Sequence, residues 1–248
     1  MNDPVSSTIL LLDIEKYSER DDVEQAFLRR MLYDLTDRAL LAAGIDETRR
    51  RRADRGDSVM ELIDANCSVV ALLRALLTEL PARLHSLNRR ASASARMRLR
   101  GVVASGFVAV DPLDGWVGSD LNHACRLLDA DALREALRAG PGDFTLGVSD
   151  SVYQGVVRHS HTGVPAEEFR PVVVDSKNGP LDAWLHGPLP QQAPRGADAA
   201  PAAPLPEPGP ASVPGSGGAP ITGGVFGGTN HGIGGGTFHG NVSFGGGR

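Results

Sequence analysis

The chain has 248 residues and a net charge of −5, and its composition changes near residue 187. Ten of its 17 prolines lie in 188–220 and 15 of its 30 glycines in 215–247, so we expect one globular domain over 1–186 and a tail. An acidic domain argues against general nucleic-acid binding. No apolar stretch has the roughly 18 residues of a membrane helix and no signal peptide is visible, so we expect no membrane contact and a cytoplasmic protein.

The first half of the domain predicts the order β-α-β-β-α-β. Apolar runs and apolar residues at helical spacing carry this prediction, and Pro81 should kink or break the second helix. Gly106 should interrupt the last strand. The order is that of a ferredoxin-like antiparallel sheet with helices on one face. The predicted elements are a strand at 9–12, a helix over 22–43, two short strands within 48–64, a helix over 69–87 and a strand over 97–110.

The second half of the domain adds further α and β elements to this core. Ser149 is a suitable N-cap for a short helix, and the apolar runs around it predict strands. The predicted fold class is therefore α+β. The added elements are a helix over 119–138, a strand at 144–148, a helix ending near 157, and strands at 169–174 and 181–185.

Polar motifs stand at the ends of several predicted elements. Two carboxylates on adjacent strands supply the oxygen ligands that Mg²⁺ or Mn²⁺ requires. Asn122 and Arg126 are four residues apart and share one helix face, and the arginine fork suits developing phosphate charge. In order, the motifs are Asp13 after the first strand, Gly56-Asp57 in a hairpin turn, Arg100 in the stretch 100–106, the helix start 118–127, and Lys177 in the last turn.

This set of motifs resembles class III adenylyl and guanylyl cyclases, over about residues 8–186. Their pattern has a metal-binding Asp at a strand end, a hairpin G-D, R-x-G-I-x-x-G, and G-x-x-V-N-x-A-x-R. The resemblance implies a metal-dependent nucleotidyl cyclase that converts a nucleoside triphosphate to a 3′,5′-cyclic nucleotide and pyrophosphate. It also implies a head-to-tail homodimer, because the family draws its metal aspartates from one subunit and its Asn/Arg pair from the other.

The resemblance assigns roles to individual residues. Asp13, Ile14 and Asp57 would hold two Mg²⁺ or Mn²⁺ ions. Lys177 would contact the triphosphate, and the pair formed by Asn122 and Arg126 would orient the ribose and stabilise the pentavalent phosphate. Each residue also has a purely structural alternative: a strand-end or turn aspartate, an exposed polar helix face, or a solvated lysine. Arg100 is interpreted as structural, and the run of arginines at 49–52 as a solvated strand face rather than an attractor of triphosphate.

The base-reading positions depart from the family pattern. They fall on Ala53 and on Gly115, with Asp114 beside it, so neither standard base code is present. A missing hydrogen-bond partner removes base discrimination. The base therefore stays open, and a pyrimidine, as in the bacterial antiphage pyrimidine cyclases of this fold, is an alternative. A catalytically silent module that binds nucleotide or partners is another.

The tail divides into two parts. Residues 187–220 are rich in proline and alanine and predict an extended linker. Residues 221–248 hold a two-copy repeat in which Ile, Gly, Gly, Phe and Gly recur after twelve positions. Residues 221–244 resemble the amyloid-type signalling motifs of bacterial immune effectors, which template on a partner NTPase receptor. The alternative is an unstructured glycine-rich tail.

Overall fold

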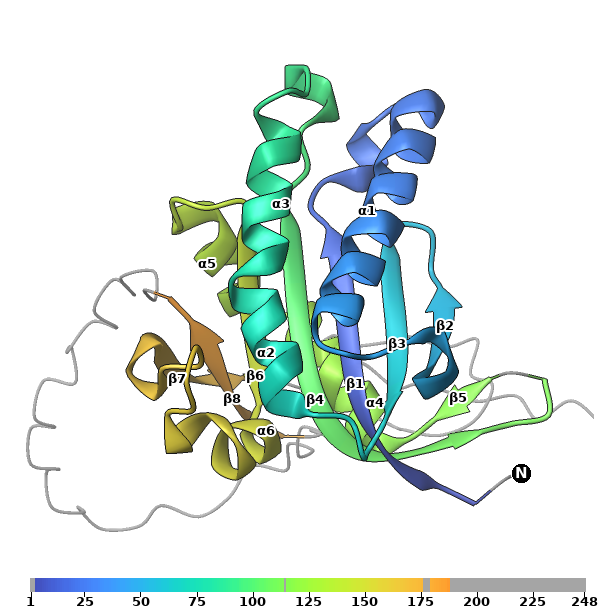
Figure 1. Ribbon diagram of the computed structural model, residues 1–248, viewed down its shortest axis with the longest axis vertical. Coiled ribbons are helices and arrows are strands. Elements are labelled where there is room, and N and C mark those ends of the chain that lie inside the picture. Colours follow the sequence, from blue (N-terminus) through green and yellow to red (C-terminus); the bar gives the residue numbers. More distant parts are fainter. Residues whose placement is uncertain (1–2, 114, 176–178, 188–248) are drawn as a thin grey trace, which may run out of the picture. The chain divides into compact units, whose positions relative to one another are not determined.

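The computed structural model describes residues 3–113, 115–175 and 179–187, which form a mixed sheet with helices on both faces (Figure 1). The strand order is β2-β3-β1-β4-β6-β8-β7, and β5 pairs with β4 alone. The strands are β1 (Val5–Ile14), β2 (Arg50–Asp54), β3 (Ser58–Asp64), β4 (Leu99–Val110), β5 (Trp116–Val117), β6 (Phe144–Ser149), β7 (Phe169–Val174) and β8 (Leu181–His186). The α-helices are α1 (Asp22–Ala42), α2 (Val69–Leu77), α3 (Glu79–Asn88), α4 (Ser119–Leu128), α5 (Asp131–Ala139) and α6 (Asp150–Gly155).

The first half of the domain has the predicted ferredoxin-like arrangement. β1 lies between β3 and β4 and runs antiparallel to both, and β2 and β3 form an antiparallel hairpin. β6 then pairs with β4 in parallel, which makes the whole sheet mixed. The predicted α+β class is therefore confirmed.

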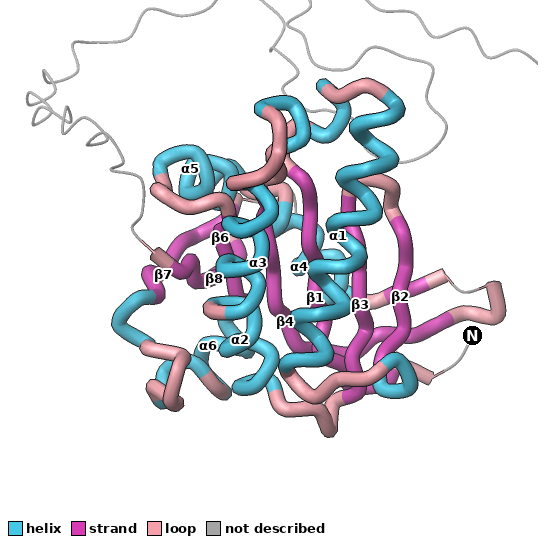
Figure 2. The backbone as a smooth tube through the Cα atoms, turned by 45° about the horizontal axis from the view of Figure 1, so that its top comes forward, coloured by secondary structure: helices cyan, strands magenta, loops and turns pink. Residues whose placement is uncertain are grey.

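The two faces of the sheet carry separate cores. Alternate residues of β1 point to opposite faces, as strand geometry requires. Leu10 and Leu12 pack with α1, α2 and α3, whereas Ile9 and Leu11 pack with α4 and α5 (Figure 2). The helices of the first half thus cover one face, as predicted, and α4 lies on the other.

Two of the predicted helices are each divided into two. The second ends as α2 at Leu77 and restarts as α3 at Glu79, because Pro81 lacks the N–H that would bond to the carbonyl of Leu77. The expected break at Pro81 is thus confirmed. The single helix predicted over 119–138 is wrong: α4 and α5 are separated at Ala130, whose backbone is extended although it is neither glycine nor proline.

The predicted interruption of β4 at Gly106 is also wrong. The strand is continuous from Leu99 to Val110. A Cβ on Gly106 would lie 2.1 Å from Asp120 Oδ2, so glycine here admits the start of α4 against β4. The two-residue strand β5, which turns back on β4, was not predicted.

Candidate active site

Asp13 lies near the end of β1, on the face that α4 covers. It is 7% exposed, and it stands opposite Arg100 of β4 in the strand register. Arg100 Nη2 donates to Asp13 Oδ2 in a short ion pair. Arg100 Nη1 also donates to the carbonyl of Leu128 at the end of α4, over 3.2 Å. Arg100 therefore links the buried carboxylate to the helix above it.

The hairpin between β2 and β3 brings Asp57 to the end of β1. Gly56 has a φ of +85°, which an L side chain rarely adopts, and its N–H donates to Asp54 Oδ1 over 2.8 Å. Ile14 N donates to the carbonyl of Asp57 over 3.0 Å. The predicted turn at Gly56-Asp57 is confirmed, and Asp57 is exposed beside the buried Asp13.

The charges around Asp13 are unbalanced. Burial raises the pKa of Asp13 to about 6, the Arg100 guanidinium opposes this shift, and the charges of Asp57 and Asp129 add to it. Asp129, directly after α4, was not anticipated from the sequence. Asp57 and Asp129 thus add negative charge around a carboxylate that pairs with Arg100, and a site with excess negative charge favours a cation.

Glycines let α4 approach the sheet closely at its first turn. A Cβ on Gly118 would lie 2.6 Å from the carbonyl oxygen of Phe107, so only glycine fits there. Asp120 Oδ2 accepts from Phe107 N over 2.9 Å. These contacts explain the glycine that opens the helix motif, and they fix the start of α4 against β4.

Asn122 and Arg126 project from α4 without contacting the aspartates. Asn122 is exposed, and Arg126 is partly buried. Arg126 Nη1 is fully buried and has no hydrogen-bond partner among the described residues. Within the described part of the chain, no hydrogen bond or ion pair joins Asn122 or Arg126 to Asp13 or Asp57. Within one chain, Asp13 and Asp57 thus lie at the same strand end, and among the described residues neither Asn122 nor Arg126 is bonded to them.

Solved structures similar to this chain include nucleotidyl cyclase catalytic domains. The adenylate/guanylate cyclase/hydrolase from Silicibacter pomeroyi is 21% identical over 75% of this chain and 99% of that chain, with a TM-score of 0.52. The guanylate cyclase domain of RhGC from Catenaria anguillulae in complex with GTP is 16% identical over 77% and 100%, with a TM-score of 0.50. The fold is that of a nucleotidyl cyclase catalytic domain.

A third cyclase structure agrees with this assignment of the fold. The catalytic core of a rhodopsin-guanylyl cyclase with converted specificity, in complex with ATPalphaS, is 14% identical over 76% of this chain and 98% of that chain, with a TM-score of 0.51. No protein-family model matches the sequence, and no curated protein matches it. At these identities the similarity to cyclases is one of fold.

Two of the predicted base-reading positions of the cyclase fold can be described. Ala53 is partly buried on β2, on the α4 face, and has no polar side-chain atom. Gly115 N donates to Asp111 Oδ1 over 2.8 Å, and a Cβ there would lie 2.4 Å from Asp111 Oδ2. Neither residue can read a base through its side chain. Asp114, Lys177 and the tail beyond residue 187 lie outside the described residues.

The donor set near Asp13 fits ions that are shared with a substrate. No group of three or more His, Cys, Asp or Glu side chains that could hold a metal occurs among the described residues. Mg²⁺ is often bound by one or two carboxylates together with substrate phosphates, and Asp13 with Asp57 matches that pattern.

In the described part of the chain, no helix is long and apolar enough to span a bilayer.

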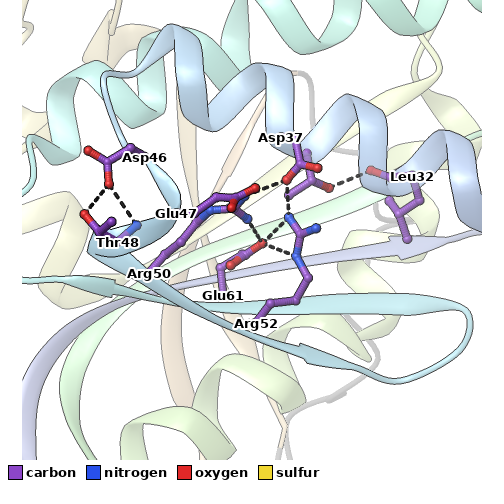
Figure 3. Close-up of polar contacts among 9 residues, drawn as sticks. Leu32, Asp37, Asp46, Glu47, Thr48, Arg50, Arg52 and Glu61 are labelled. Carbon is purple, nitrogen blue, oxygen red and sulfur yellow. Dashed lines mark hydrogen bonds and ion pairs between the residues drawn. The ribbon is translucent and has the colours of Figure 1, made fainter.

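The interpretation of the arginine run as a solvated strand face is wrong for two of its members. The Arg50 side chain is 8% exposed and that of Arg52 is 20% exposed. Both form ion pairs with Glu61, which is fully buried, and with Asp37 (Figure 3). A sequence feature that could have indicated these ion pairs is Glu61 itself, a charged residue in the middle of the apolar strand β3.

Proposed function

We propose that the chain is a metal-dependent nucleotidyl cyclase, which converts a nucleoside triphosphate to a 3′,5′-cyclic nucleotide and pyrophosphate. The observation that carries the proposal is the convergence of Asp13 and Asp57 beside Arg100, in a cyclase fold and on the face that α4 covers. The excess of carboxylates there supports divalent-cation binding. Triphosphates are abundant in the cytoplasm, where we place the activity.

Asp13 and Asp57, with the carbonyl of Ile14, would hold two Mg²⁺ or Mn²⁺ ions. Such ions polarise the attacking ribose 3′-hydroxyl and neutralise the triphosphate. With a pKa of about 6, Asp13 is mainly ionised at neutral pH and available as a ligand. Its burial excludes water from one side of the site and strengthens its electrostatic attraction.

The remaining residues would bind and orient the nucleotide. The guanidinium group of the partly buried Arg126 would donate to an oxygen on the α-phosphate. The exposed Asn122 amide, one turn earlier, would orient the ribose. Lys177 would bind the triphosphate. Ala53, Gly115 and Asp114 would line the base subsite.

Among the described residues no hydrogen bond or ion pair joins Asn122 or Arg126 to the aspartates, which fits a shared active site in a homodimer. In a head-to-tail dimer, α4 of one protomer would face Asp13 and Asp57 of its partner. Each of two composite sites would then combine residues from both chains.

Complementation tests the shared site. Asp57→Ala and Arg126→Ala chains should each be inactive, and mixing them should restore up to about a quarter of wild-type activity, because random pairing makes about half of the dimers mixed and each retains one intact site. Pyrophosphate release is the measurement. Inactive mixtures that contain mixed dimers, detected by native mass spectrometry, would contradict the proposal.

A catalytically silent cyclase-like module, which binds nucleotide or a partner, is the second candidate. It is favoured by the absence of side-chain polar groups at Ala53 and Gly115. The deciding experiment incubates the purified full-length chain with each of the four NTPs and Mn²⁺ and analyses the products by mass spectrometry. A cyclic nucleotide supports the enzyme. Nucleotide binding without any cyclic product supports the silent module.

We further propose that the protein is a signalling or immune effector recruited through residues 221–244 by an NTPase receptor. The repeat puts Phe226 and Phe238 at equivalent positions, where copies in a fibre would stack in register. A peptide of residues 219–248 should form fibres that bind thioflavin, and Phe238→Asp should prevent this by placing like charges about 4.8 Å apart. A wild-type peptide that stays monomeric at high concentration would contradict the proposal.

A further inference from the structure

β2 is an edge strand that few apolar contacts hold in place. Among the described strands it pairs only with β3, at the end of the sheet. Its sequence, Arg-Arg-Arg-Ala-Asp, contains no large aliphatic side chain. By the alternation of the strand, Arg50 and Arg52 face α1, whereas Arg51 and Ala53 face the α4 side. Hydrophobic packing against α1 therefore cannot be what fixes the position of this strand.

A compact ion-pair network joins β2 to α1 instead. Arg50 Nη1 lies 2.6 Å from Glu61 Oε1, and Arg50 Nη2 lies 2.7 Å from Asp37 Oδ1. Arg52 repeats both contacts, with Nε at 2.5 Å from Glu61 and Nη2 at 2.6 Å from Asp37. Figure 3 shows both guanidinium groups converging on these carboxylates from the sheet side. The ring of Tyr33 packs 4.7 Å from the Arg52 guanidinium.

The network is balanced in charge and sealed at its centre. Glu61 is 0% exposed, and Arg50 and Arg52 match the carboxylates of Glu61 and Asp37. The exposed Glu47 also lies 4.0 Å from Arg50 Nη2. Burial raises the pKa of Glu61, and Arg52 and Arg50 oppose that shift. Burial alone would also raise the pKa of Asp37, but hydrogen bonds from Arg52 and Arg50 hold it below its ordinary value. The charges of Glu61 and Asp37 are thus matched by the two arginines, and Arg50 Nε and Glu61 Oε2 are buried without a hydrogen-bond partner among the described residues.

The strand held by this network leads directly into the candidate site. Ala53 follows Arg52, and the hairpin then carries Asp57, whose carbonyl accepts from Ile14 N. A long side chain at position 53 could offset a small shift of the strand by changing rotamer, but a methyl group cannot. The shape of the subsite around Ala53 therefore depends on where the backbone of β2 lies.

We infer that Arg52, through its contacts with Glu61 and Asp37, is a positioning residue that determines nucleotide selection at the subsite lined by Ala53. This inference rests on the proposed cyclase function. Directional contacts to three partners, Tyr33 included, fix the strand between α1 and β3, and the strand fixes the wall of the subsite. Arg52 touches no nucleotide itself.

The test measures kcat/KM for all four NTPs in wild type, Arg52→Met and Arg49→Met. Arg49 is the matched control, because its ion pair with Asp64 at the other end of the strand is about 40% exposed on both sides. Arg52→Met should change the ratio of kcat/KM between the preferred and second-best NTP by about tenfold, a typical effect of reshaping a pocket. Arg49→Met should leave the ratio within about twofold. Partial unfolding scales all four values equally and cannot change a ratio.

Two further variants keep the test decisive if Arg52→Met folds poorly. Arg52→Lys retains charge but only part of the fork, and should give an intermediate ratio. The triple variant Arg50→Met/Arg52→Met/Glu61→Leu replaces the network with apolar side chains, which often preserves stability. A folded triple variant with the wild-type ratio would overturn the inference. If wild type forms no cyclic product, the proposed function fails, and the same ratios, taken from nucleotide dissociation constants, decide the positioning role.

Discussion

The two faces of the sheet each bury a carboxylate against arginine, and they differ in what surrounds it. On the α1 face, Glu61 is fully buried, and together with Asp37 it meets Arg50 and Arg52. Two negative groups face two positive groups. The charges of these four side chains are matched within the chain.

On the α4 face, Asp13 is buried against Arg100 alone, and Asp57 and Asp129 add their negative charge. Arg134 pairs with Asp129 at 3.3 Å, but both of these side chains are more than 40% exposed, so solvent screens that pair. The cluster keeps an excess of negative charge at the end of a buried strand. Similar residue types thus build a cluster with matched charges on one face and a cluster with excess negative charge on the other.

The largest expected effect separates the two faces by activity. Asp13→Asn should reduce Mn²⁺-dependent pyrophosphate release by about a thousandfold, because it removes a ligand of the metal ions. These ions would stabilise the charge that develops in the transition state by several kcal/mol. Asp34→Asn is the control, since Asp34 pairs with Arg38 on the exposed surface of α1. Undiminished turnover in a folded Asp13→Asn protein would remove the metal role from this face.

The next effect concerns stability and belongs to the balanced face. Glu61→Leu should lower the free energy of unfolding by about 3 kcal/mol, because Arg50 and Arg52 then lack their buried counter-charge. Arg38→Ala, which removes an exposed pair, should cost less than about 1 kcal/mol. Urea denaturation measures both. Equal decreases in the free energy of unfolding in the two variants would show that the buried ion pairs of Glu61 stabilise the fold no more than an exposed pair does.

An effect of at most that size depends on pH and comes from the α4 face. Burial raises the pKa of Asp13 from 3.8 to about 6, so between these values the folded chain holds a proton that the unfolded chain has released. Stability from this group is therefore full below about pH 4 and falls as pH rises to about 6, by up to about 3 kcal/mol. The difference in unfolding free energy between wild type and Asp13→Asn, measured with EDTA present, should follow this fall. A difference that is flat with pH would contradict it.

Local patterns predicted the parts of the site that local rules govern. The apolar run before Asp13 fixes a buried strand end, and the glycine before Asp57 fixes a turn, because each depends on adjacent residues only. The predicted interruption of β4 at Gly106 is wrong because the role of this glycine depends on a residue distant in the sequence. Its absent side chain makes room for Asp120, which the fold alone brings next to it.

The unpredicted parts are contacts between distant segments. Glu61 looked like one polar residue in an apolar strand, and its partner Asp37 lies on a helix earlier in the chain. Asp129 raises the pKa of Asp13 because the packing of α4 against β4 brings the two carboxylates near each other. No spacing rule connects such residues, so the balance of charge in each cluster could be read only from the structure.

Manganese binding tests the contrast between the two clusters most directly. Calorimetric titration of the full-length chain with MnCl₂ alone should give saturable binding to wild type, and Asp57→Asn should weaken it by at least about tenfold. Asp37→Asn makes the same carboxylate-to-amide change on the α1 face, where it can act on the metal site only through the position of β2, and it should change the Kd far less than Asp57→Asn. Equal Kd values for wild type and Asp57→Asn, or a loss of binding in Asp37→Asn alone, would contradict the assignment of the metal site to the α4 face.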